Sequence, residues 1–103
     1  MSAIITTHVL SEEVISYCEA HNLLNHLETA LRLADECFKP IENLEVSVEP
    51  DPEVEGVETV VIDIWIRASV EVGLAQKSAY TKRWITSVPA DILGRIALLF
   101  YLI

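Results

Sequence analysis

The apolar residues change their spacing at Pro40, and this change constrains the fold more than any other feature of the chain. From Leu23 to Phe38 they recur every three or four positions, which is the period of an amphipathic helix. Lys39-Pro40 ends this pattern, because the residue before a proline avoids the helical backbone region. From Ile41 onward apolar and polar residues alternate, as in a half-buried strand. Separate blocks with these two periods predict an α+β protein.

The same periods predict the elements of the first two thirds of the chain. We expect helices at about 12–21 and 23–38, the first capped by Ser11, with His21-Asn22 either breaking one longer helix or lying within it. Strands are expected over 41–48 and 57–68. The segment 50–56 is rich in turn residues, so the two strands should form an antiparallel hairpin.

The last third is predicted to contain a helix, a short helix and a strand. Ser69 is a suitable N-cap for the first helix, and Pro89-Ala90-Asp91 fits the first turn of the short one. The apolar face of the longer helix is expected on Val70, Leu74, Ala75, Ser78, Thr81 and Ile85, with Gly73, Tyr80 and Trp84 beside it. The apolar run 96–103 suits a buried strand or a buried helix, and its aromatics and the preceding Gly94 favour a strand.

These elements, in the order ααββααβ, predict one two-layer α+β domain spanning 1–103. An N-terminal helical hairpin, a β-hairpin, a helix, a short helix and a third strand would place helices on one face of a small sheet. A length of 103 residues fits one domain, and 51% hydrophobic residues are enough for a core.

Charge and cysteine content narrow the classes of partner. The formal net charge is −9, and eight carboxylates without any Lys or Arg lie between residues 42 and 63. Such a surface repels phosphate backbones and anionic lipids, so we expect neither nucleic-acid nor membrane binding.

Two cysteines and a start without a basic, apolar leader favour the cytoplasm as the location of the protein.

No motif for a cofactor or for catalysis is present, so the sequence favours a protein that is not an enzyme. Three isolated glycines build no phosphate loop. The alternative is a small metal-dependent enzyme with a site near Cys18, His21 and His26. A fourth ligand would have to come from Cys37 or His8, and the paired spacing of structural zinc sites is missing. We therefore expect no metal and no cofactor.

The second strand carries the candidate binding residues. Val60, Ile62, Ile64 and Ile66 form one row, and Val61, Asp63, Trp65 and Arg67 alternate with them. If the first row faces the helices, the second faces outward. Trp and Arg beside an apolar residue are typical of protein interfaces. We expect this row to join two copies as a homodimer, with Arg67 set against Asp63 of the other copy.

Several segments also resemble a group of short uncharacterised bacterial α+β proteins. They are Leu44–Glu53 with its Asp-Pro-Glu turn, Val60–Ile64, Arg83-Trp84, Val88-Pro89 and the apolar ending after Arg95. The resemblance implies no activity and no functional residue. The expected function is a self-associating interaction module, an adaptor or antitoxin-like protein, with a possible protein partner that the sequence does not identify.

Overall fold

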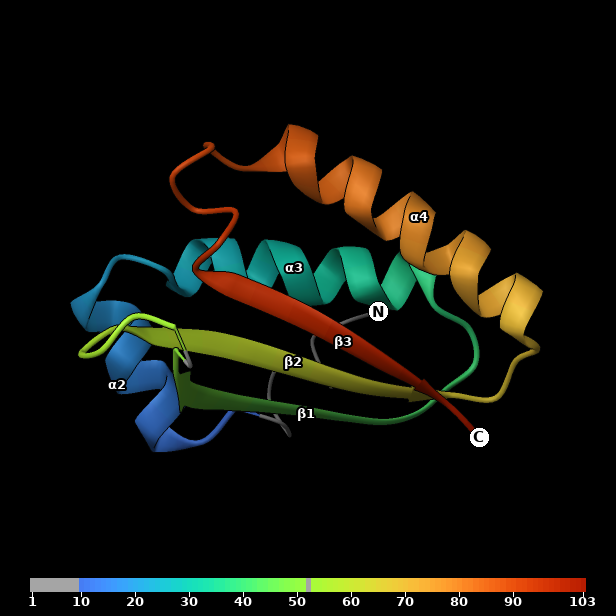
Figure 1. The fold of residues 1–103 in the computed structure, drawn as a ribbon, viewed down its shortest axis with the longest axis horizontal. Helices are drawn as coiled ribbons and strands as arrows, with labels where there is room; N and C mark the ends of the chain where they lie inside the picture. Colours follow the sequence, from blue (N-terminus) through green and yellow to red (C-terminus); the bar gives the residue numbers. More distant parts are fainter. Residues whose placement is uncertain (1–9, 52) are drawn as a thin grey trace.

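The computed structural model describes residues 10–51 and 53–103 and has an α+β fold (Figure 1). Its elements are α2 (Glu12–Ala20), α3 (Leu24–Cys37), β1 (Ile41–Pro50), β2 (Glu58–Ile66), α4 (Val70–Ser87) and β3 (Ile96–Leu102). The fold class and the order of these elements agree with the sequence prediction, including the strand at the end of the chain.

A turn at residues 21–22 separates α2 from α3. Asn22 has a φ of 57°, in the left-handed region that asparagine tolerates better than most side chains. This turn lets the Leu23 N–H donate to the Cys18 carbonyl at 2.7 Å. The two-helix alternative is therefore the correct one. At the start of α2, the Ser11 hydroxyl accepts from the Val14 N–H at 3.2 Å, as expected of an N-cap.

The sheet has the strand order β1-β2-β3, with β2 in the centre. β1 and β2 are antiparallel neighbours, whereas β2 and β3 run parallel. A parallel pair needs a crossover connection, and α4 supplies it. At the middle of the sheet Ile62 lies between Val46 of β1 and Leu98 of β3.

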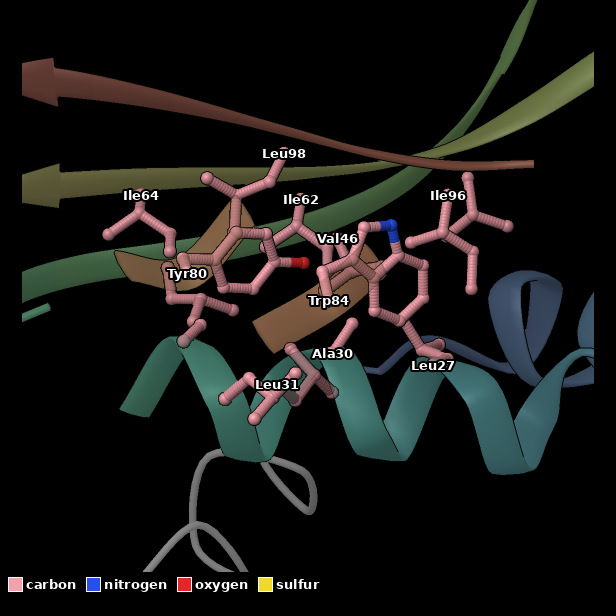
Figure 2. Close-up of a cluster of buried hydrophobic side chains, with 14 of the residues drawn as sticks. Leu27, Ala30, Leu31, Val46, Ile62, Ile64, Tyr80, Trp84, Ile96 and Leu98 are labelled. Carbon is pink, nitrogen blue, oxygen red and sulfur yellow. The ribbon is translucent and has the colours of Figure 1, made fainter. Parts of the chain in front are cut away.

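One hydrophobic cluster fills the space between the sheet and the helices. Its sheet side is the predicted inner row of β2, in which all four residues are fully buried: Val60, Ile62, Ile64 and Ile66. Leu27, Ala30 and Leu31 face them from α3, and Figure 2 shows Tyr80 and Trp84 of α4 inserted between α3 and the strands. The inner row is thus fully buried within one copy of the chain and has no surface left to contact a second copy.

Two sequence expectations about the last third are wrong. Gly73, Tyr80 and Trp84 form the buried face of α4, while Val70, Leu74 and Ile85 are more than half exposed. The larger aromatic side chains of Tyr80 and Trp84 fill the space between α3 and the sheet (Figure 2). For this reason α4 turns these residues, and not the predicted apolar face, toward the core. The expected short helix is a series of turns, in which the Ile92 N–H donates to the Pro89 carbonyl and the Arg95 N–H to the Ile92 carbonyl.

Candidate functional site

The candidate binding residues lie on the face of the sheet opposite the core. Val61, Asp63 and Trp65 are half-buried and Arg67 is exposed, while their neighbours along β2 are fully buried. Because successive side chains of a strand point to opposite faces, this alternation places the row on the outer face. We call this surface the outer sheet face.

The outer sheet face changes in character from one edge to the other. On β1 the partners of Val61, Asp63 and Trp65 are polar: Ser47, Glu45 and Asn43. On β3 the partners of the same residues are Ala97, Leu99 and Tyr101. Leu99 and Tyr101 are 50% and 41% exposed. The face is therefore acidic toward β1 and apolar toward β3.

Aromatic and polar contacts connect β2 to β3 on this face. The rings of Trp65 and Tyr101 stack with centroids 5.0 Å apart and planes 23° apart. The Tyr101 hydroxyl donates to Asp63 Oδ1 at 3.2 Å. Partial desolvation and this hydrogen bond raise the pKa of the Tyr101 phenol. The stacked rings form a flat apolar surface that is held in one orientation without a partner.

Arg67 has a partner within the chain. Its Nη2 lies 3.5 Å from Glu42 Oε1 in an ion pair between two exposed side chains. Asp63 is likewise engaged by Tyr101. An Arg67–Asp63 pair between two copies would have to replace both contacts, and exposed ion pairs contribute only about 0–1 kcal/mol. The apolar part of the outer sheet face therefore contributes most of the free energy with which this face can bind a partner.

Sequence reasoning missed Leu99 and Tyr101 as members of this surface. The alternation in 96–103 is hidden by the nearly continuous apolar run. The parallel pairing of β3 with β2 brings the two residues beside Asp63 and Trp65, and no local pattern specifies that register. The one available signal was the presence of Val61 and Trp65 in the outer row of β2, which favours apolar side chains on a neighbouring strand.

The two edges of the sheet differ as well. β1 carries Glu42, Glu45 and Glu49, all exposed, and charged side chains on an edge strand discourage pairing with another strand. β3 has no charged residue, and within residues 10–51 and 53–103 it pairs only with β2. The uncharged edge and the apolar half of the outer sheet face thus adjoin each other.

The alternative metal site is not assembled among the described residues. Cys18 is fully enclosed in the core, and burial raises the pKa of its thiol, which favours the protonated form that does not bind metals. The hollow of about 250 Å³ beside it is lined by neither His21 nor His26. No group of three or more His, Cys, Asp or Glu side chains in the described part of the chain is arranged to hold a metal ion. His8 lies outside that part.

Comparisons with family models, curated proteins and solved structures found no match to this chain. The resemblance to short bacterial proteins therefore rests on the sequence patterns alone. In the described residues, every helix is too short or too polar to cross a bilayer.

Proposed function

We propose that the protein is a non-enzymatic interaction module that forms a homodimer through the apolar half of the outer sheet face. The observation that supports this proposal is the stacked Trp65–Tyr101 pair beside half-exposed Leu99, on a face opposite the core. Aromatic residues that are held rigid before binding lose little conformational entropy in an interface. Rigid apolar surface of this kind is typical of the centre of a protein–protein contact.

The charge gradient across the face favours one arrangement of the two copies. A twofold axis near β3 brings the apolar halves together, because each copy then presents the same surface to the other. The carboxylates of Glu45 and Glu49 on β1 are then farthest from the axis. An axis near β1 would instead bring like charges together, which destabilises the contact. The second copy is thus expected to cover Trp65, Leu99 and Tyr101.

The size of the face sets the expected affinity. Three strands, with β3 seven residues long, form a surface of roughly 15 by 23 Å at standard strand spacings. Stable interfaces bury about 800 Å² on each partner, so this face, with an area of roughly 350 Å², is below that range and fits a weak, transient dimer. We therefore expect a dissociation constant in the micromolar range, about 1 to 100 μM.

This arrangement also leaves a surface for a different partner. Exposed carboxylates follow β1 and the hairpin turn: Glu42, Glu45, Glu49, Glu53, Glu55 and Glu58. A dimer joined on the β3 side keeps these acids accessible to a basic protein, as an adaptor or antitoxin-like role requires. The cytoplasm is the proposed location, because Cys18 and Cys37 are both free thiols.

Sedimentation equilibrium over a range of about 1 to 300 μM tests the proposed dimer. We expect the wild-type chain to dimerise and Trp65→Asp to remain monomeric with an unchanged circular dichroism spectrum. Ile85→Asp is the matched control, because Ile85 is 53% exposed on α4, away from the outer sheet face. A wild-type chain that stays monomeric at the highest concentration contradicts the proposal. So does a dimer that Ile85→Asp abolishes and Trp65→Asp leaves intact.

A further inference from the structure

The end of α2 and the beginnings of β2 and β3 lie on the same side of the molecule (Figure 1). A pocket lies at this place. It has a volume of about 370 Å³. Its walls are Tyr17, His21, Gly56, Val57, Glu58 and Arg95. The residues come from three parts of the chain: α2 with its C-cap His21, the hairpin turn with the first residue of β2, and the residue before β3. The pocket is separate from the Trp65–Tyr101 surface.

Arg95 has an unusual environment in this pocket. Arg67 and Arg83 are exposed, yet each pairs with a carboxylate: Glu42 at 3.5 Å and Glu36 at 2.6 Å. Arg95 is half-buried, and no carboxylate of the described residues forms an ion pair with it. Its Nε is enclosed without a hydrogen-bond partner, which among the described side chains is true of no other buried nitrogen or oxygen. A partly buried cation is stabilised by a hydrogen-bond acceptor or a counter-charge, so this guanidinium favours an anionic ligand.

Tyr17 holds the Arg95 guanidinium in place. The Tyr17 hydroxyl donates to the Glu58 carbonyl oxygen at 3.1 Å and accepts from Arg95 Nη2 at 3.4 Å. The only proton of the Tyr17 hydroxyl is therefore donated to Glu58, and the hydroxyl oxygen fixes the position of Arg95 Nη2. The Tyr17 ring packs on the exposed His21 imidazole with centroids 4.2 Å apart. The guanidinium has further N–H groups that no described residue accepts, and the imidazole offers a second donor at the rim.

We propose that this pocket binds a small carboxylate through the Arg95 guanidinium. The planar fork of N–H groups matches the two oxygens of a carboxylate, and the Tyr17 ring and Val57 offer apolar contact to the rest of the molecule. Glu58 lines the same pocket, and exposed Glu53 and Glu55 lie in the adjoining turn. These charges disfavour a phosphate dianion more strongly than a carboxylate monoanion. A free organic acid and the carboxyl end of a peptide share this chemistry.

Nuclear magnetic resonance titration of the ¹⁵N-labelled full chain tests the proposal, because the Arg95 Nε–H gives its own signal. With benzoate as the probe we expect saturable shifts of this signal, with a dissociation constant of about 1 mM for so small a ligand. Inorganic phosphate should bind at least about tenfold more weakly. A short peptide with a free carboxyl end is the second probe, and its amidated form should not bind.

Variants of Arg95 lack the Nε–H signal, so their binding is followed by the backbone amide signals of Gly56 and Val57, which line the pocket. Arg95→Gln should weaken benzoate binding at least about tenfold, and Arg95→Lys severalfold, because lysine keeps the charge without the fork. Arg83→Gln is the matched control, because Arg83 is exposed on α4 and does not line the pocket, and it should leave binding unchanged. Arg95→Lys serves as the test if the glutamine variant does not fold. Absence of saturable shifts, phosphate binding as tight as benzoate, or equal binding by wild type and Arg95→Lys overturns the proposal.

Discussion

The enclosure of Tyr80 between α3 and the sheet predicts a loss of stability at alkaline pH. Tyr80 is 3% exposed, and its ring lies 5.8 Å from that of Phe38 and 6.3 Å from that of Trp84, measured between centroids. Burial, together with the nearby Cys37, raises the pKa of its phenol well above the ordinary value. The folded chain therefore keeps this proton at a pH where the unfolded chain releases it.

The size of the effect follows from proton linkage. An unfolded tyrosine ionises near pH 10, so the contribution of Tyr80 is fully present below about pH 10 and is lost as the pH rises toward its raised folded pKa. Each pH unit in that window lowers the free energy of unfolding by about 1.4 kcal/mol. Between about pH 8 and pH 11.5 the loss from Tyr80 alone should reach about 2 kcal/mol.

Urea unfolding followed by circular dichroism at the two pH values measures this loss. Tyr80→Phe removes the titrating hydroxyl and keeps the ring, so its loss between the two pH values should be about 2 kcal/mol smaller than that of the wild type. Tyr101→Phe is the control, since Tyr101 is 41% exposed and its ionisation is less penalised. If Tyr80→Phe and the wild type lose equal stability, Tyr80 is not enclosed and the orientation of α4 is wrong.

Three further predictions test the local structure by substitutions at four positions. Trp84→Ala should lower the free energy of unfolding by about 3–5 kcal/mol, whereas Ile85→Ser, one residue further along α4, should change it by less than about 1 kcal/mol in urea unfolding. Ser69→Ala removes the hydroxyl that accepts from the Val72 N–H at 3.2 Å, and calorimetry should show a loss of about 1 kcal/mol. Asn22→Gly should be neutral or slightly stabilising, because glycine adopts the positive φ of this position without strain. Asn22→Ala should lower the free energy of unfolding by about 1 kcal/mol, measured by thermal unfolding. Equal melting temperatures for these two variants would contradict the left-handed turn.

Local patterns were sufficient to predict the elements up to the end of β2. The three- and four-residue spacing before Pro40 indicates a helix with one buried face, and the alternation after it indicates a strand with one buried face. Each pattern depends only on its own segment of the chain. The alternation separated the row from Val60 to Ile66 from the outer row, and the structure places this inner row in the core. The same reasoning failed for α4, where small and apolar residues occur on several sides of the helix. There the choice of buried face depended on the gap that Tyr80 and Trp84 fill (Figure 2).

The candidate sites were predictable only in part, for a related reason. The outer residues Val61 and Trp65 could be named from the sequence, because they lie on one strand with a clear period. Their neighbours Leu99 and Tyr101 could not, because the parallel register of β3 depends on how α4 crosses the sheet. The Arg95 pocket combines α2, the hairpin turn and the start of β3, which are far apart in the chain.

Side-chain periodicity, which each segment expresses independently, thus determined the α+β class, the order of the elements and the two faces of β2. Tertiary structure decided which side of α4 is buried, which residues adjoin Trp65, and that Tyr17 meets Arg95. The physical reason is that a periodic pattern records only whether a side chain is buried. The identity of its neighbour depends on how distant segments fill a shared volume.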